Sequence, residues 1–512
     1  MLRSALWHNR CMEEGLRHPA GSDWQPEAVL EGSANWPLVF GTVLVGLVIA
    51  MVAGTHVAVA LVVLPIVVAV AFVSPQSLVL IVVVWMLELG FIRRFVPGGN
   101  VSGISGDPLL ILGPVMILAL AMRAYSAGAF RNRTRLATVV MLLNLLAIFE
   151  AFNPSQGSIM TGFGGLLFML VPVMAFWVGR AIVTPRIFDQ VRWTVAIIAL
   201  ANALYGLSQQ FMGFQSWDQR WINSQGYTAL NLGNGVVRAF GSSSSAQEYA
   251  VTLAFGIIAW ISLLPNVRRA ARPLILVAVV PMALALYWES QRSALLLLVF
   301  GVGLVLGTQM RLRARWVALA GVATVALLVF GANAIGTGGP AQEGNAASTL
   351  SNHQISGIAD PFGSKSSGTN HMNRTIKGLT EGVTNPLGTG TGSVTLAGSK
   401  FSTVSKGTEM DPGNMGIALG LPGEILYFSA LLLAFALAYR RGSEGNPAGA
   451  FAVGILGAGL FQWFNGDLYG VCWLVWLTLG YIDQLPAAVE PEVVDLLAPA
   501  PRRVGVVQPW RP

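Results

Sequence analysis

The chain has few charged residues for its size. Only 11% of its 512 residues are Asp, Glu, Lys or Arg, whereas 54% are hydrophobic and the mean hydropathy is +0.63. A soluble protein needs more polar side chains than this to cover its surface. The apolar residues fall in runs of roughly 17 to 25, the length that crosses about 30 Å of hydrocarbon as a helix. The composition excludes a soluble enzyme and predicts a membrane protein.

The sequence is also poor in the residues that build disulfides and metal sites. Its two cysteines, Cys11 and Cys472, lie at different predicted depths, so we expect no disulfide framework. No cluster has metal-ligand spacing and no phosphate-binding P-loop is present, so we expect neither a metal nor another cofactor. The net charge of +7 comes from arginines at the ends of apolar runs, which indicates membrane topology before nucleic-acid binding.

Hydropathy and span length predict an all-α polytopic bundle. About fourteen candidate spans lie within residues 36–335 and 414–484. The first two could form one broken element, so the expected number is about 12 to 14. Residues 1–35 have no apolar signal-peptide core and are expected to form a polar cytoplasmic tail. Residues 485–512, rich in proline and alanine, are expected to be a disordered cytoplasmic tail.

Arginines mark alternate breaks between the apolar runs. Five successive alternate breaks hold them, represented by Arg131, Arg186, Arg269, Arg313 and Arg440. Positive residues stay on the cytoplasmic side, so both termini are predicted to be cytoplasmic. Residues 212–246 and the large loop 336–413, which precedes the last three spans, are then predicted to lie outside. The low-complexity part of that loop, residues 336–367, is expected to be partly disordered.

Three arginines break this pattern because they fall on the predicted outer face. Arg238 precedes a span, Arg292 lies in a very short hairpin and Arg374 lies in the large loop. An arginine presents a planar fork of donors that matches phosphate oxygens two at a time. Together they would suit a lipid diphosphate headgroup. Alternatively, each one pairs with a nearby acid, Glu289 for Arg292 and Glu248 for Arg238, or reaches to lipid phosphates.

Other ionisable residues also fall at unusual places. Arg93 and Arg94 follow the third predicted span and add to the positive charge on the outer face. Glu88 and Glu150 lie within or at the end of apolar runs, where an ionisable group is costly and commonly functional. Because Glu150 lies near a span end, it could instead extend to the membrane surface.

Three segments on the predicted outer face carry a family pattern. They are Val237-Arg238-Ala239-Phe240-Gly241, then Ser290-Gln291-Arg292-Ser293-Ala294-Leu295, then the large loop with Arg374, Asn385-Pro386-Leu387-Gly388-Thr389-Gly390 and the helix opening Leu419-Gly420-Leu421-Pro422-Gly423. In this order they resemble the superfamily of O-antigen ligases and O-antigen or exopolysaccharide polymerases. The resemblance covers roughly residues 238–423.

The resemblance implies a metal-independent glycosyltransferase of the bacterial plasma membrane. Such an enzyme takes a glycan from a polyprenyl-diphosphate carrier on the outer face, and Arg238, Arg292 and Arg374 would hold the diphosphate and stabilise its growing charge. The implied partners are the polyprenyl-diphosphate-linked glycan and membrane lipid, with a chain-length regulator and a flippase as further candidates. No nucleic-acid partner is implied.

The expected general base differs from that of the ligases, which carry a histidine shortly before the closing helix. Here the matching stretch, residues 406–414, has no histidine but contains Glu409 and Asp411. A carboxylate can also take a proton from an attacking hydroxyl, so these two are the predicted catalytic residues. Asp411 could instead cap the positive N-terminal end of the next helix.

The missing histidine favours a polymerase that joins polyprenyl-diphosphate-linked oligosaccharide repeats into a surface polysaccharide. Two alternatives stay open: a ligase that transfers glycan to a lipid or protein acceptor, and a flippase or other transporter of lipid-linked oligosaccharide. A transporter should show internal repeats, broken helices and ionisable residues near the membrane midplane. Most of the charge here falls instead in the predicted loops.

Overall fold

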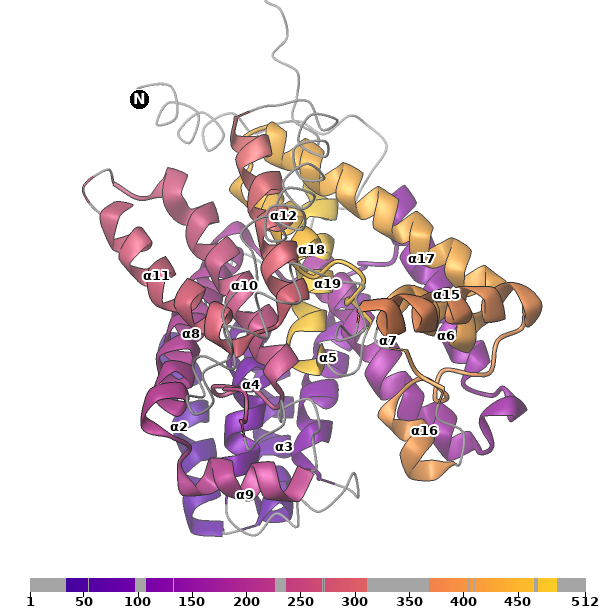
Figure 1. Ribbon diagram of the computed structural model, residues 1–512, viewed down its shortest axis with the longest axis horizontal. Coiled ribbons are helices and arrows are strands. Elements are labelled where there is room, and N and C mark those ends of the chain that lie inside the picture. The colour runs from indigo at the N-terminus through magenta and orange to yellow at the C-terminus, as the bar shows by residue number, and fades with distance from the viewer. Residues whose placement is uncertain are drawn as a thin grey trace, which may run out of the picture.

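The computed structural model describes residues 34–310 and 368–485, except positions 54, 97–106, 132, 226–235, 269, 271, 403–405, 409 and 465–467. These residues form helices packed into a bundle (Figure 1). In chain order they are α2 (Trp36–Ala53), α3 (His56–Val73), α4 (Pro75–Phe95), α5 (Leu109–Ser126), α6 (Arg135–Glu150), α7 (Ile159–Ala181), α8 (Pro185–Met212), α9 (Ser216–Gln225), α10 (Ala246–Leu263), α11 (Arg272–Glu289), α12 (Arg292–Gln309), α15 (Gly368–Thr384), α16 (Leu396–Phe401), α17 (Asp411–Ser443), α18 (Pro447–Ala458) and α19 (Tyr469–Gln484).

Long apolar helices dominate the described part of the chain, which confirms the predicted all-α polytopic bundle. Nine of them are long and apolar enough to cross a membrane: α3, α4, α5, α7, α8, α10, α11, α12 and α17. The prediction of about 12 to 14 spans is higher partly because hydropathy does not separate a span from a short buried helix. The predicted span at residues 448–464 is the 12-residue helix α18, and the one at residues 316–335 lies outside the described residues.

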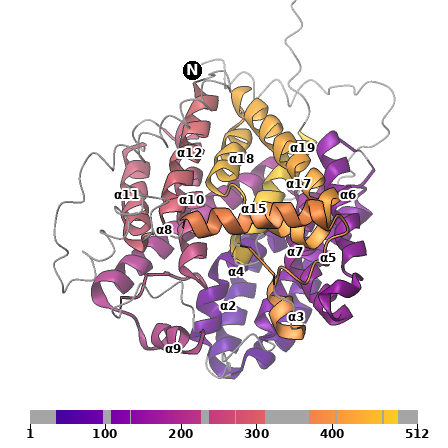
Figure 2. The ribbon, with the colours of Figure 1, turned by 45° about the vertical axis from the view of Figure 1, so that its right-hand side comes forward.

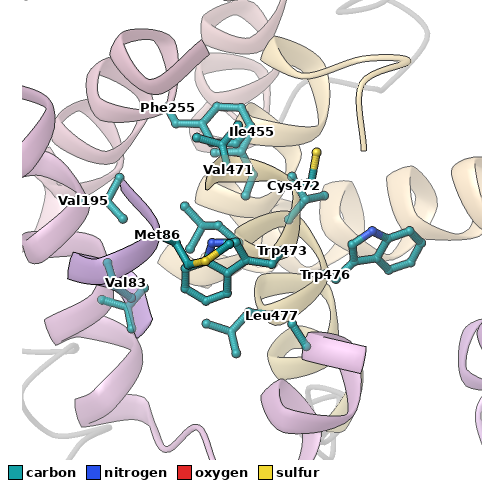
Figure 3. Packing of buried hydrophobic residues seen from close by; sticks show 14 of the residues in the cluster. Val83, Met86, Val195, Phe255, Ile455, Val471, Cys472, Trp473, Trp476 and Leu477 are labelled. Carbon is teal, nitrogen blue, oxygen red and sulfur yellow. The ribbon is translucent and has the colours of Figure 1, made fainter. Parts of the chain in front are cut away.

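The core of the bundle surrounds α19. Nearly all of its residues are buried, including Trp473 and Trp476, although the helix has only 16 residues. Figure 3 shows the Trp473 indole beside Met86, whereas the Trp476 indole points to the other side of α19, where it contacts Trp463 and Phe464. A helix that is apolar on every side and buried on every side belongs in the centre of a bundle. The sequence alone gives this helix the same appearance as a lipid-facing span.

The connections between helices that carry arginines lie together at one end of the bundle. Thr134, before α6, donates to Asp483 Oδ1 near the end of α19 at 2.8 Å, and Arg180 near the end of α7 pairs with Asp483 Oδ2 at 3.4 Å. Arg441 near the end of α17 donates to the carbonyl of Leu485. We call this the arginine-loop end. The opposite end, where α6 ends and α7 begins, is called the site end.

The helix α17 reverses direction at Gly420. This glycine has φ 63° and ψ −161°, a backbone conformation that other residues adopt only at a cost. Residues 411–419, which we call the re-entrant segment, fold back against the part of α17 that follows. The Tyr427 hydroxyl, seven residues after the turn, therefore lies 3.4 Å from Asp411 Oδ2 at the start of the segment. Every residue of the segment is buried.

The predicted large loop contains two helices in its described part, α15 and α16. The first of them, α15, packs along the re-entrant segment through small residues, with Gly378 against Gly413 and Gly382 against Gly416. Figure 2 shows α15 lying across the helices of the bundle. Close approach of two backbones at glycine fixes the position of α15 on α17. Residues 336–367, for which we predicted partial disorder, lie outside the described residues.

Candidate functional site

A short polar segment, residues 238–245, turns inside the site end of the bundle. Arg94, near the end of α4, donates to the carbonyl oxygens of Ser243 at 3.0 Å and Gly241 at 2.7 Å. Its guanidinium also pairs with Asp218 at 3.5 Å and lies 4.6 Å from the ring centre of Phe240. Both charged side chains are completely buried. Such a buried pair needs hydrogen bonds to offset lost hydration, and the segment's carbonyls supply them.

Two amide side chains of α8 bind the backbone of the same segment. Gln209 Oε1 accepts from the amide of Gly241 at 2.8 Å, and Asn202 Oδ1 accepts from the amide of Ser242 at 2.7 Å. Asn202 also donates to Ser243 Oγ at 3.2 Å. Gly241 has a φ of 51°, and a Cβ there would collide with Asn202 Oδ1. The turn is therefore held in one conformation, and its glycine is required.

The acids near the serine run bind the segment and not the arginine that precedes it. Glu248 accepts from the backbone amide and hydroxyl of Ser244 and from the amide of Gly470 at 2.7 Å. Glu88 of α4 accepts from the Ser242 hydroxyl at 3.2 Å. Ser245 Oγ accepts from the Glu248 amide and caps α10. The serines therefore form a turn and the N-cap of α10.

Arg238 opens the segment and pairs with an acid far away in sequence. Its Nη1 lies 3.8 Å from Glu289 Oε1, where Glu289 is fully buried and the Arg238 side chain is 17% exposed. The other Glu289 oxygen accepts from the Gln291 amide at 2.9 Å. The pairing of Arg238 with Glu248 that we considered from the sequence is wrong, because Glu248 faces backbone donors.

Arg292 is the first residue of α12, at the same end of the bundle as Arg238. The charge of Arg238 is close enough to act electrostatically on Arg292, whose side chain is partly buried. Two like charges in a partly desolvated place repel each other, and an anion between them relieves the repulsion. The N-terminal end of α12 adds a partial positive charge at the same place. We call these two residues the arginine pair; Glu289 is the acid that contacts it.

Arg374 lies on a separate element, in the second turn of α15, with its side chain exposed. In both views the N-terminal end of α15 points towards the α10 and α12 side of the bundle, and its C-terminal end lies by α6 (Figure 1 and Figure 2). The structure thus brings Arg238 and Arg292 together, and it places Arg374 on the half of α15 that extends in their direction.

Asp411 is completely buried at the start of the re-entrant segment. Its Oδ2 accepts from the backbone amides of Trp463 and Phe464, the latter at 3.0 Å, as well as from the Tyr427 hydroxyl. Asp411 lies in the first turn of α17, as the capping alternative expects, but it makes no capping hydrogen bond, because Met410 is the N-cap residue and the carboxylate binds amides of a different segment. Asp411 therefore joins α17 to the turn before α19.

Glu409, the second predicted catalytic residue, lies outside the described residues. Glu150 lies at the end of α6, where it accepts from Asn153 Nδ2 at 2.7 Å. The described residues hold no group of three or more His, Cys, Asp or Glu side chains that could bind a metal ion.

Sequence reasoning missed the residues that hold the site. Gln209 and Asn202 look like ordinary polar interruptions of α8, and Asp218 looks like a loop acid, yet all three are buried around residues 238–245. The sequence did contain a signal for buried contacts at these positions, because uncharged polar residues inside an apolar helix need hydrogen-bond partners within the protein. The sequence did not show which partners they find.

The sequence matches no protein-family model and no curated protein. The functional conclusion therefore depends on the residues at the site end and on the sequence pattern that they carry.

Proposed function

We propose that the protein is a membrane glycosyltransferase that polymerises polyprenyl-diphosphate-linked oligosaccharide repeats into a surface polysaccharide. The observation that carries this proposal is the arginine pair, two partly buried arginines at the site end whose charges act on each other, with Arg238 Nη1 3.8 Å from Oε1 of the buried Glu289. Two arginine forks match the oxygens of a diphosphate better than those of a single carboxylate. The rigid support of residues 238–245 favours a binding site that is formed before the ligand arrives.

The proposed reaction breaks the bond between the anomeric carbon of the donor glycan and the diphosphate oxygen. A hydroxyl of the acceptor glycan forms the new bond to that carbon and loses its proton. The diphosphate leaves with the bonding electrons, and Arg238 and Arg292 stabilise its added negative charge. Arg374 is the third proposed contact, reaching the diphosphate or the first sugars from α15.

The proposed base is Asp411, with Glu409 as the second candidate. Asp411 Oδ2 is taken by backbone amides, whereas Oδ1 is buried and has no hydrogen-bond partner among the described residues. A base must come within hydrogen-bond reach of the acceptor hydroxyl. Because Asp411 has no exposed surface, this role requires the helices that cover it to move during the reaction.

We place the protein in the plasma membrane of a bacterium, with the arginine-loop end and both termini in the cytoplasm. The arginine pair then faces the outside, where a flippase would deliver the donor and a chain-length regulator would act. A cysteine replacing exposed Thr384 should react with an impermeant thiol reagent in intact cells, and one replacing exposed Glu444 should not. The reverse labelling would overturn this orientation.

A second candidate function is transport of a lipid-linked oligosaccharide, and the reversal of α17 at Gly420 favours it. Broken helices commonly mark the substrate site of a transporter. A flippase would move a fluorescent lipid-linked oligosaccharide between leaflets of a proteoliposome without changing its length. A ligase, the other alternative, would transfer the glycan to a different acceptor and produce no ladder of longer donor-linked glycans.

The test of the proposed function incubates the purified protein in lipid nanodiscs with a polyprenyl-diphosphate oligosaccharide. The products are extracted and separated by size. Longer lipid-linked glycans at regular size intervals would support polymerisation. An unchanged donor, together with movement of the donor between leaflets of proteoliposomes, would contradict polymerisation and support transport.

A further inference from the structure

The helix α15 has three distinct faces. Its buried face is made of small residues, Thr375, Gly378 and Gly382, which lie against α17. One flank is apolar, and its members recur at helical spacing: Met372, Ile376, Leu379 and Val383. The opposite flank is charged and carries Arg374, Lys377 and Glu381.

The apolar flank is not covered by the described protein. Met372 is 49% exposed, Ile376 52% and Val383 61%. Three large apolar side chains in a row on one flank of a helix are unusual on a surface that faces water. The charged flank is suited to water, since Lys377 is exposed and Glu381 pairs with Lys406 at 3.1 Å.

The turn that follows α15 fixes where the C-terminal end of this helix lies along the axis of the bundle. Gly388 accepts from Asn153 Nδ2 at 3.3 Å, and the Gly392 amide donates to Gln156 Oε1 at 3.1 Å. Asn153 and Gln156 lie in the short connection between α6 and α7, where the chain leaves one helix and enters the next. The C-terminal end of α15 therefore lies at the membrane boundary of the site end, and the helix runs across the bundle from there (Figure 2).

An exposed apolar surface follows the apolar flank along the chain. After α15, Leu387 lines an open apolar groove of about 560 Å³ together with Leu421 and Ile425 of α17. Ile425 is 58% exposed on a helix that is long and apolar enough to span a membrane, so we expect lipid chains beside it. The apolar flank of α15 ends at Val383, four residues before Leu387, so the two exposed apolar surfaces follow each other along the chain.

We propose that α15 is an interfacial helix whose apolar flank is embedded in the lipid leaflet at the site end. Ile376 and Val383 contact acyl chains, while Arg374 and Lys377 lie at the level of lipid headgroups, as in amphipathic helices that lie on membranes. The lipid surface thereby sets the rotation of α15 and the direction in which Arg374 extends. This inference rests on the membrane location of the chain and not on the proposed glycosyl transfer.

The test measures depth at adjacent residues. In a background lacking Cys11 and Cys472, single cysteines replace Ile376, Val383, Lys377 and Thr384, and each is spin-labelled in lipid nanodiscs. We expect collisions with oxygen, which concentrates in lipid, to exceed those with a water-soluble nickel complex severalfold at Ile376 and Val383. The order should reverse at Lys377 and Thr384, the matched controls. Each variant is first checked for an unchanged elution volume and melting temperature.

Two outcomes would overturn the proposal. Free access of the nickel complex at all four positions would put α15 in water, and exclusion of both reagents from Ile376 and Val383 would show that another protein covers them. The unmodified chain offers a second readout at Met372. In nanodiscs we expect a water-soluble oxidant to convert Met372 to its sulfoxide at least tenfold more slowly than in the denatured chain, and an equal rate would contradict the inference.

Discussion

Arg94 and the arginine pair lie at the same end of the molecule but have different surroundings. Arg94 is completely buried and directs its donors at two backbone carbonyls and Asp218. Arg238 and Arg292 are partly buried and close enough for their charges to act on each other, and Arg238 pairs with Glu289. The comparison teaches that a completely buried arginine at this end supports the backbone, whereas two partly buried arginines with like charges close together are the candidates for binding an anion.

The largest expected effect comes from removing the buried arginine. In Arg94→Ala the carboxylate of Asp218 and two carbonyl groups lose their partner inside the bundle. Breaking a buried ion pair on one side costs roughly 3 to 5 kcal/mol of the free energy of unfolding. We expect a much lower yield and a markedly lower melting temperature in detergent. Arg268→Ala, at an exposed position near the arginine-loop end, is the control and should melt like the unmodified protein.

The arginine pair should respond in the opposite way, through activity and not stability. Arg238→Lys and Arg292→Lys keep the charge but lose the fork, so we expect turnover to fall roughly 10- to 100-fold, the loss of one good charge-assisted hydrogen bond. The melting temperature should stay nearly unchanged. Normal turnover in these two variants and in Arg374→Lys would exclude a diphosphate clamp.

Two substitutions of Asp411 separate a role in holding the backbone from a role in proton transfer. Asp411→Asn keeps an oxygen for the Trp463 and Phe464 amides but cannot take a proton, so we expect turnover to fall about tenfold while donor binding persists. Asp411→Ala removes the acceptor as well and should lower the melting temperature by leaving those amides unpaired. A fully active Asn variant would show that the base lies elsewhere, with Glu409→Gln as the next variant to measure.

The smallest expected effect concerns Asp107, the acid that binds Arg93, the neighbour of Arg94. Asp107 accepts from Arg93 at 2.5 Å and lies 2.9 Å from His56 Nδ1. Burial would raise the pKa of Asp107, but these two partners outweigh it and lower the pKa from 3.8 to about 2. The carboxylate therefore stabilises the folded state above pH 3.8 and loses that contribution as the pH falls towards 2.

Between pH 5 and pH 3 the loss should be about 1 kcal/mol of the free energy of unfolding. The measurement is the melting temperature of the purified protein across that range, compared with Asp107→Asn. The variant should lack this part of the pH dependence. Equal pH dependence in both proteins would mean that Asp107 does not stabilise the fold in this way.

Much of this arrangement follows from the sequence through simple rules. Span length predicts the helical bundle, and the alternation of arginines predicts that the breaks holding Arg186 and Arg440 share one end. The same alternation marks Arg238 and Arg292 as unusual, and in the structure their charges are close enough to act on each other. These properties depend on whether each segment of the chain prefers water or lipid, and hydropathy reports that preference directly.

The rest depends on contacts between distant residues. Arg238 pairs with Glu289 and not with Glu248, because Glu248 is taken by the amides of Ser244 and Gly470. The reversal at Gly420 cannot be separated from a continuous helix by hydropathy, since both sides of it are apolar. For the same reason the sequence indicated a large loop where α15 packs on α17.

The central claim is that the arginine pair holds the diphosphate of a glycan donor during polymerisation. The most direct measurement compares the unmodified protein, Arg292→Lys and Arg268→Lys in nanodiscs supplied with a polyprenyl-diphosphate oligosaccharide. We predict a ladder of longer lipid-linked glycans from the unmodified protein and from Arg268→Lys, and little or none from Arg292→Lys at equal melting temperature. A full ladder from Arg292→Lys, or no ladder from the unmodified protein, would contradict the claim.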